Sequence, residues 1–440
     1  MRMNLPPNVN RIIHTLQENG FEAYAVGGCV RDSILGRVPG DWDITTSASP
    51  QEIKSLFSHT VDTGIEHGTV TVLMDREGFE VTTYRVDGDY EDCRHPKSVQ
   101  FTRNLREDLL RRDFTINAMA YNDEDGLVDI FGGMEDLEKR MIRCVGCARE
   151  RFGEDALRIM RAVRFAAQLG FEIEKETKEA IRALAGNLRQ ISAERIQTEL
   201  VKLMTSPHPE LIREAYELGI TAVILPEFDR LMDTAQETPH HFCNVGQHTI
   251  HVICAVRNDR ILRLAALFHD FGKPDMKSID AEGVAHFTGH GKRSEEMTRV
   301  ILKRLKFDNY TLRNVCKLVL YHDYHYKTKA TPENVRRSMA IIGEELFPYY
   351  IELRRADMMG QSEYRRAEKM ENLALVEQYY HETLENGDCV SLKTLAVTGK
   401  DLIEAGIRQG KAVGETLEKL LDVVLSDPGK NTKEELLKLI

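Results

Sequence analysis

The sequence predicts an α+β protein, with a small mixed α/β domain at the N-terminus and an elongated, almost wholly helical remainder. Three observations support this fold class. Strand and helix patterns alternate over residues 1–142. From about Glu150 onward, apolar residues recur at helical spacing. The length of 440 residues also exceeds what a single core usually organises, so we expect two to four domains.

Periodicity and turn residues define each element of the first domain. Amphipathic or turn-bounded segments predict helices at residues 8–19, 30–35 and 51–57. The third of these starts after Pro50, and proline favours the first turn of a helix. Alternation of polar and apolar residues predicts strands at residues 23–26, 42–45, 69–74 and 79–86. The last two form a hairpin whose turn lies at residues 75–78.

The remainder repeats a helical pattern that turn residues interrupt. Helices are expected at residues 154–169, 174–185, 193–204 and 210–218. Residues 226–244 have an irregular pattern and contain Pro239, which indicates a boundary. The expected domains are a head (1–142), a helical neck (143–240), a histidine-rich metal-binding domain (241–365) and a helical body and tail (366–440).

The charge and composition exclude several classes of protein. A net charge of −11 argues against a uniformly basic surface that coats nucleic acid, although residues 139–164 hold eight basic and three acidic residues. The chain has no apolar run of about 18 residues, and its first ten residues lack the apolar core of a signal peptide. Eight scattered cysteines form no disulfide framework. We therefore expect a cytoplasmic protein with no membrane partner.

A glycine pair follows the strand expected at residues 23–26. Gly27 and Gly28 allow the backbone to approach a phosphate closely, and the N-terminus of the next helix faces that anion. Arg31, near the start of that helix, adds a guanidinium that can form a charged fork to a triphosphate. This pattern predicts a nucleotide-phosphate site.

Two carboxylates, Asp41 and Asp43, follow the glycine pair. Because they are two positions apart on an expected strand, their side chains point to one face and repel each other unless a cation neutralises them. Magnesium is the expected ion, and a two-metal site would activate an attacking hydroxyl and hold a pyrophosphate leaving group. Glu80 is the expected third catalytic carboxylate; the alternative is an exposed acid of the hairpin.

With these residues, four later segments resemble motifs of the class II CCA-adding enzymes, the tRNA nucleotidyltransferase and poly(A) polymerase family within the DNA polymerase beta superfamily. The segments are residues 110–120, 129–137, 154–158 and 192–196. The resemblance implies a DNA polymerase beta-like head and template-independent addition of CCA to the 3′ end of tRNA from CTP and ATP, with release of pyrophosphate. The implied nucleotide-binding residues are Gly27, Gly28, Arg31, Arg112, Asp113, Asn117, Asp155, Arg158, Arg161 and Arg164.

Asp155 and Arg158 resemble the base-selecting pair of that family. They are three positions apart in the helix expected at residues 154–169, so they share a face. A carboxylate accepts from an exocyclic amine, and a guanidinium donates to a ring nitrogen or carbonyl. This pair would therefore accept cytosine and adenine and reject uracil and guanine. The alternative is a structural salt bridge on a helix.

The polar segment at residues 84–96 resembles the flexible loop of family members that complete the terminal adenosine. It contains Gly88 and ends at Pro96, a composition typical of a mobile loop. Members that add only the two cytidines generally lack this loop. Its presence favours an enzyme able to add the final adenosine.

Nine histidines fall between residues 240 and 325, around an adjacent His-Asp pair, and the segment resembles the HD metal-dependent phosphohydrolases. The resemblance implies the metal ligands His248, His269, Asp270 and Asp357, joined by His290 and His322 if two metals bind. Imidazole with carboxylate suits a divalent transition metal or magnesium, which could activate water against a phosphoester. Some relatives with such a domain resemble 2′,3′-cyclic phosphodiesterases or phosphatases that repair tRNA ends.

The glycine-rich segment at residues 396–414 resembles the tRNA-binding body of the family. Glycines there let the backbone approach RNA phosphates, and RNA helices are recognised mostly by shape and phosphate. The expected partners are therefore tRNA, CTP and ATP. The oligomeric state is left open by the sequence.

Three alternatives to CCA addition stay open. A poly(A) polymerase of the same family is one, although those relatives tend to be more basic than this chain, whose pI is near 5.8. An A-adding enzyme that works with a separate CC-adding partner is the second. The third is an HD phosphohydrolase whose degenerate head binds RNA; the intact Asp41, Asp43, Arg112, Asp155 and Arg158 argue against it.

Overall fold

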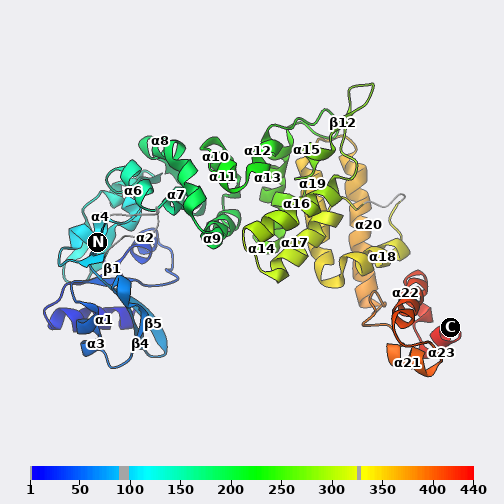
Figure 1. Cartoon of the computed structure of the whole chain (residues 1–440), viewed down its shortest axis with the longest axis horizontal. Helices are drawn as coiled ribbons and strands as arrows, with labels where there is room; N and C mark the ends of the chain where they lie inside the picture. Colours follow the sequence, from blue (N-terminus) through cyan, green and yellow to red (C-terminus); the bar gives the residue numbers. More distant parts are fainter. Residues whose placement is uncertain (1, 89–98, 325–328) are drawn as a thin grey trace. The chain divides into compact units, whose positions relative to one another are not determined.

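The computed structural model describes residues 2–88, 99–324 and 329–440 and divides into two compact units, residues 1–225 and 226–440 (Figure 1). The first unit holds a large sheet and a series of helices. The described part of the second unit is helical apart from a short ribbon, β12 (Ser278–Ile279) with β13 (Ala285–His286). This arrangement confirms the predicted α+β class. Within the described ranges, no helix combines the length and apolar character needed to span a membrane.

A seven-stranded sheet in the order β3-β4-β5-β2-β1-β8-β9 organises the head. Its strands are β1 (Ala23–Val26), β2 (Ile44–Thr46), β3 (Thr60–Gly64), β4 (Thr69–Met74), β5 (Glu77–Thr83), β8 (Met119–Asn122) and β9 (Gly126–Asp129). Neighbouring strands are antiparallel except β2 and β5, which are parallel. The sequence pattern predicted β1 and β4 with these bounds. It missed β3, β8 and β9 because their burial does not alternate along the strand.

Short helices cover the sheet and carry its connections: α1 (Pro7–Glu18), α2 (Gly28–Ile34), α3 (Pro50–Leu56) and α4 (Leu105–Leu110). The buried residues of α1 recur at helical spacing and are Val9, Ile12, Ile13 and Leu16. At the start of α3, the Ser49 hydroxyl accepts from the Glu52 N–H while the Glu52 carboxylate accepts from the Ser49 N–H. This reciprocal capping explains why α3 begins directly after Ser49.

The α-helices that complete the first unit are α5 (Gly133–Glu138), α6 (Ala148–Glu154), α7 (Leu157–Leu169), α8 (Lys175–Leu184), α9 (Ala193–Met204), α10 (Ile212–Glu217) and α11 (Thr221–Ile224). A single helix was expected at residues 154–169, and this expectation was wrong at its start. Asp155 has extended backbone angles, and its Oδ1 accepts the N–H of Leu157 at 3.0 Å. Aspartate favours such capping contacts, so one helix ends before Asp155 and α7 begins after it.

The second unit is built from helices, including α12 (Pro226–Met232), α13 (Val245–Ala255), α14 (Arg260–Phe268), α16 (His290–Arg304), α17 (Asn309–Tyr321), α19 (Phe347–Gly360) and α20 (Arg366–Glu385). Residues 226–244 were expected to be irregular, and this expectation was wrong for the first seven of them. Those residues form α12, which has a proline at its first position. Helix α13 packs against both α14 and α19. These contacts bring histidines from separate parts of the chain together.

A small separate core closes the C-terminal part of the second unit. Its helices are α21 (Gly399–Glu404), α22 (Lys411–Ser426) and α23 (Lys433–Leu437). The buried side chains of this core include Val397, Leu402, Leu420, Val424 and Leu436. The glycine-rich segment singled out in the sequence lies on α21, on α22 and between them.

Candidate functional site

The first candidate site lies where β1 ends and α2 begins. Gly27 has a φ of 83°, in the left-handed region that favours glycine. A Cβ on Gly27 would lie 3.0 Å from Nη1 of Arg112, so the absence of a side chain makes room for that guanidinium. The N–H of Gly27 donates to the carbonyl of Met119 at 3.1 Å, and that of Val26 donates to the carbonyl of Asp43 at 3.0 Å. The glycine turn is therefore tied to β8 and to the acidic pair.

The predicted carboxylates Asp41 and Asp43 lie just before β2 instead of within a strand, because β2 starts at Ile44. The parallel pairing of β2 with β5 sets Ile44 opposite Val81. Extended by one residue, this register sets Asp43, which precedes β2, beside Glu80, which is exposed and whose charge acts on Asp43. The sheet thus brings the third predicted carboxylate to the acidic pair.

The electrostatics of Asp43 fit a nearby cation. Desolvation by the surrounding protein raises its pKa although its side chain is solvent-accessible, and the charge of Asp41 raises the pKa further. Arg112 lowers the pKa of Asp43, and Glu80 raises it. Repulsion among carboxylates is relieved when a divalent cation binds. Among the described residues, two clusters of the second unit have potential ligand atoms that all lie within 4.8 Å of one another. The three head carboxylates do not meet this distance.

Four of the predicted nucleotide-binding residues form one chain of contacts. Arg31 donates from Nη1 to Oδ1 of Asn117 at 2.6 Å, and Asn117 donates from Nδ2 to Oδ1 of Asp113 at 3.0 Å. Nη2 of Arg161, on α7, lies 2.6 Å from Oδ2 of Asp113. Burial alone would raise the pKa of Asp113, but the charge of Arg161 and the hydrogen bond from Asn117 lower it to about 2. The ionised Asp113 therefore holds Arg161 directly and Arg31 through Asn117. Arg31 also donates two hydrogen bonds to Asp32, each at 2.9 Å.

Three guanidinium groups gather around Phe165. Those of Arg31, Arg161 and Arg164 lie 5.2, 5.2 and 3.6 Å from the ring centroid. Arg164 also donates from Nε to Oε2 of Glu199 at 2.8 Å, and both side chains are buried. This ion pair neutralises Arg164 and joins α7 to α9. The binding of nucleotide phosphates by Arg164 stays a prediction.

Asp155 is held by a residue that lies forty positions away in the sequence. Arg195, on α9, donates from Nη2 to Oδ2 of Asp155 at 2.6 Å and from Nη1 to Oδ1 at 3.3 Å. Arg195 belongs to the segment at residues 192–196, one of the four segments that resemble family motifs, but its contact with Asp155 was not predicted. Sequence spacing carries no signal for contacts between separate helices.

Arg158 is fixed by a different set of partners. It donates from Nη1 to Oε2 of Glu154 at 2.6 Å and from Nη2 to the carbonyl of Arg111 at 2.7 Å. Its exposed fraction is 9%. Because Asp155 lies in the break between α6 and α7, the two residues are anchored separately instead of sharing one helical face.

Asp108, on α4, was not among the predicted site residues, although it contacts one of them. Its Oδ1 lies 2.8 Å from Nη2 of Arg111, and its Oδ2 lies 3.5 Å from Nη2 of Arg112. The hydroxyl of Thr45, in β2, donates to Oδ2 at 3.1 Å. Asp108 is fully buried and thus links Arg112 to the strand that follows the acidic pair. The spacing of four residues between Asp108 and Arg112 is the signal that could have identified it.

Part of the predicted mobile loop at residues 84–96 falls on residues 89–98, which lie outside the described residues, as does His325 of the histidine cluster. The described part of this segment contains β6 (Arg85–Asp87), which pairs with β7 (Val99–Phe101).

The second candidate site lies in the second unit and contains His248, His269, His290 and His322. Each donates from Nδ1 to a backbone carbonyl, so Nε2 is the ring nitrogen that faces the other potential ligands. The four acceptors are, in order, the carbonyl oxygens of Gly360, Ala266, Phe287 and Val319, at 3.2, 2.8, 2.9 and 2.7 Å. The Nε2 atoms of His248 and His269 lie 3.4 Å apart, and those of His290 and His322 lie 3.1 Å apart. Imidazole nitrogens gathered in this way suit metal coordination.

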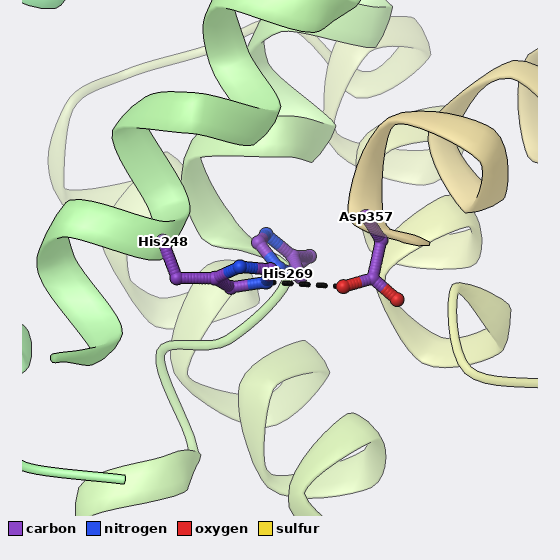
Figure 2. Close-up of side chains that lie close together, drawn as sticks. All are labelled: His248, His269 and Asp357. Atoms are coloured by element: carbon purple, nitrogen blue, oxygen red, sulfur yellow. Dashed lines mark hydrogen bonds and ion pairs between the residues drawn. The ribbon is translucent and has the colours of Figure 1, made fainter. Parts of the chain in front are cut away.

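The six predicted metal ligands form two groups of three, and within each group the potential ligand atoms lie within 4.8 Å of one another. The groups are His248 with His269 and Asp357, and Asp270 with His290 and His322. Figure 2 shows His248 and Asp357 facing each other in the first group, with Nε2 of His248 3.0 Å from Oδ1 of Asp357. These two residues lie 109 positions apart, so only the fold could bring them together.

Asp270 lies between the two groups. Its Oδ2 is 3.2 Å from Nε2 of His269, and its Oδ1 is 3.5 Å from Nε2 of His290. Both oxygens are buried: Oδ2 forms an ion pair with Lys273, whose Nζ lies 2.7 Å away, and Oδ1 accepts no hydrogen bond from the described residues. The single ammonium offsets part of the cost of burying this carboxylate, and a metal ion held by the same ligand set would offset more of it. The donor set therefore fits one or two divalent metal ions.

A cavity of about 490 Å³ opens onto this cluster. Its lining combines metal-ligand candidates with cationic side chains and includes Asp270, His290, Asp357, Lys273, Arg354 and Lys369. The volume is sufficient for a small ligand or the end of a polymer. Neither Arg354 nor Lys369 was predicted from the sequence, because no local motif surrounds them.

Three family models match the chain. A model described as "Poly A polymerase head domain" matches residues 23–143. One described as "Probable RNA and SrmB-binding site of polymerase A" matches residues 170–232. A model of tRNA nucleotidyltransferase domain 2 matches residues 280–440. The matches follow one another over most of the chain.

Similarity to individual proteins extends over nearly the full length. A CCA-adding enzyme of Lactobacillus helveticus is 36% identical over 433 residues, which cover 98% of this chain and 95% of the relative. One of Levilactobacillus brevis is 35% identical over 429 residues, which cover 98% and 96%. The crystal structure of the Bacillus stearothermophilus CCA-adding enzyme in complex with CTP is similar with a TM-score of 0.74 and 30% identity. That similarity covers 99% of this chain and 97% of the other.

Proposed function

Because the chain belongs to the family of the CCA-adding enzymes, we propose that it adds C, C and A to the 3′ end of tRNA from CTP and ATP and releases pyrophosphate. The observation that carries this proposal is the acidic pair Asp41 and Asp43 beside the Gly27 turn and Arg112. The reaction takes place in the cytoplasm under this proposal, where tRNA is the partner.

The head holds the reacting groups by charge and position. Asp41 and Asp43, with Glu80 beside them, would hold Mg²⁺, which would supply activation of the tRNA 3′-hydroxyl and charge neutralisation of the pyrophosphate leaving group. In the reaction the 3′-oxygen bonds to the α-phosphorus and the bond from that phosphorus to the β-phosphate oxygen breaks. Arg31 and Arg112 orient the triphosphate, and the backbone at Gly27 and Gly28 admits it. Asp113 and Asn117 keep Arg31 in place.

Two anchored side chains replace a template base. Asp155 offers a carboxylate acceptor to the amine of cytosine or adenine, while Arg195 holds that carboxylate in place. Arg158 offers a donor to the ring edge and is held by Glu154 and the carbonyl of Arg111. Uracil and guanine present a carbonyl where the amine should be, so they leave the carboxylate without a donor.

The decisive assay incubates the protein with tRNA that ends before CCA, Mg²⁺, and CTP and ATP singly and together. Addition of CCA and no more supports the proposal. A long adenosine tail would favour a poly(A) polymerase, and failure to add cytidine would favour an A-adding enzyme.

A double variant tests the assignment of the acidic pair. Asp41→Ala with Asp43→Ala should abolish addition, because no carboxylate pair is left to hold the cation, while tRNA binding stays largely intact. Addition by the double variant would show that the metal site lies elsewhere.

The second unit supports a second activity, metal-dependent hydrolysis of a phosphoester. The observation behind it is the pair of ligand groups, which meet where the buried Asp270 contacts a histidine of each group. A divalent transition metal or Mg²⁺ held there would supply an activated water. The metal-loaded protein should hydrolyse p-nitrophenyl phosphate, and Asp270→Asn should remove that activity while Asp41→Ala should not. Equal hydrolysis by Asp270→Asn would rule this site out.

The same unit contributes RNA binding under the proposal. The tRNA nucleotidyltransferase domain 2 model spans residues 280–440, which include the glycine-rich segment of α21 and α22. We assign residues 366–440 to contacts with the tRNA backbone, residues 241–365 to the metal cluster, residues 143–240 to the neck and residues 1–142 to the nucleotidyltransferase head.

A further inference from the structure

Three cationic side chains line the cavity beside the metal-ligand cluster, and two of them are neutralised within the protein. Nζ of Lys273 lies 2.7 Å from Oδ2 of Asp270. Nη1 of Arg354 lies 2.7 Å from Oδ1 of Asp323 and 3.0 Å from Oδ2 of Asp357. Their charges are therefore committed to the protein and give little net attraction to an anion.

The third cation, Lys369 on α20, meets only neutral hydrogen-bond partners among the described residues. Its Nζ donates to Oε1 of Gln361 at 2.7 Å and to Nδ1 of His240 at 3.2 Å. Burial is the largest influence on Lys369 and lowers its pKa, and the charge of Arg354 lowers it further, whereas the charges of Asp357 and Asp323 raise it. A half-buried ammonium whose direct hydrogen-bond partners are neutral is stabilised when an anion binds beside it.

The position of Lys369 is fixed relative to the metal ligands. Gln361 donates from Nε2 to Oδ1 of Asp357 at 3.0 Å while its Oε1 accepts from Lys369. One amide thus spans the gap between a metal ligand and the ammonium. His240, the second acceptor, packs edge-on against Tyr364 with ring centroids 4.9 Å apart. Two polar partners therefore hold the ammonium beside the cluster, at the wall of the cavity.

We propose that Lys369 binds the non-bridging phosphoryl oxygens of the phosphoester that enters this cavity. The inference rests on the proposed phosphohydrolase function of the cluster. A phosphoester bound at the cluster has oxygens that the metal ions do not take, and a lysine ammonium is a point charge suited to them. Lys369 is thus a substrate-binding residue and not a metal ligand.

The test compares wild-type full-length protein loaded with Mn²⁺ and the Lys369→Gln variant. Binding of inorganic phosphate is measured by isothermal titration calorimetry, and hydrolysis of p-nitrophenyl phosphate gives KM and kcat. Loss of one charged hydrogen-bond donor should weaken phosphate binding and raise KM by roughly ten- to hundredfold, with kcat changed by less than about threefold. Bound Mn²⁺ should stay at the wild-type amount, and Lys369→Arg should restore most of the affinity.

A matched control separates a local contact from a general change in charge. Arg365→Gln removes one positive charge four residues earlier, from an exposed side chain that pairs with Glu368. It should bind phosphate like wild type. The inference is overturned if Lys369→Gln binds phosphate as tightly as wild type, or if wild type binds none. If phosphate binding depends on Lys369 but no phosphoester is hydrolysed, the hydrolase function fails and the binding site stands.

Discussion

The role of each carboxylate in this chain depends on the chemical group that faces it. Asp155 meets the guanidinium of Arg195, and Asp113 meets that of Arg161. Asp270 instead faces histidine nitrogens as well as the ammonium of Lys273. The first two carboxylates are held by guanidinium groups, whereas the third also lies among potential metal ligands. The residue type alone does not separate these roles.

Arg195 is expected to act on base selection through Asp155. Arg195→Met removes two donors from the Asp155 carboxylate, which then loses its fixed orientation. We expect kcat/KM for CTP and ATP to fall about tenfold and misincorporation of UTP or GTP to rise, since a lost charged contact is worth about 1.5–3 kcal/mol. Single-nucleotide addition to tRNA measures both quantities. Arg189→Met, at an exposed position before α9, is the control, and identical selectivity in the two variants would contradict the role of Arg195.

The buried ion pair between Arg164 and Glu199 is expected to stabilise the first unit. Glu199→Gln leaves the Arg164 guanidinium buried without its counter-charge, and we expect the free energy of unfolding to fall by about 3 kcal/mol. Urea denaturation followed by circular dichroism measures the change. Glu415→Gln breaks an exposed pair with Lys411 and should have little effect. Equal losses in both variants would mean that burial does not set the strength of this pair.

At the scale of secondary-structure elements, turns and strand registers position the side chains of the head site. The parallel register of β2 and β5 brings Glu80 beside Asp43, and the break between α6 and α7 presents Asp155 outside a helix. The turn before α2 brings Arg112 against a glycine. The periodicity of a single helix or strand would not predict the positions of these side chains.

The strand-to-helix turn gives a prediction with a matched control. Gly27→Ala combines a strained φ of 83° with a Cβ 3.0 Å from Nη1 of Arg112. Gly36→Ala has a similar φ of 69° but nothing within 4 Å of the added Cβ. Both should lose about 1–2 kcal/mol of stability, since left-handed angles disfavour alanine. Only Gly27→Ala should also raise KM for CTP and ATP severalfold; a similar rise in Gly36→Ala would show that strain, not displacement of Arg112, is responsible.

The whole molecule divides its chemistry between two compact units. The head carboxylates lie in the first, and the paired ligand groups lie in the second. A ligand that binds only the native state raises the free energy of unfolding by mass action. A metal bound by the histidine and aspartate ligands of the second unit should therefore stabilise that unit alone.

Metal removal tests this separation. In scanning calorimetry of the full chain, we expect two transitions, of which one rises in temperature with added Mn²⁺ and falls with EDTA. Asp270→Asn should remove that shift, while Asp41→Ala with Asp43→Ala should retain it. A shift that survives in Asp270→Asn would place the stabilising metal outside the histidine cluster.

Local patterns accounted for much of the fold and for many of the candidate site residues. The helix α9 and the strands β1 and β4 were predicted with their observed bounds because periodicity and turn residues are local properties. The motif around Gly27, Asp41 and Asp43 was equally visible, since its residues lie close together in the chain. Short strands without alternation and the helix break at Asp155 were missed, because their burial and capping depend on neighbours.

The sequence by itself determined which chemical groups this protein carries and the order in which they occur. The tertiary structure decided which of them meet. The register that sets Glu80 beside Asp43, the contact of Arg195 with Asp155, and the approach of Asp357 to His248 all join separate elements. So does the link from Asp357 through Gln361 to Lys369 on the next helix. Contacts of this kind arise from packing between elements, and spacing along one element carries no information about them.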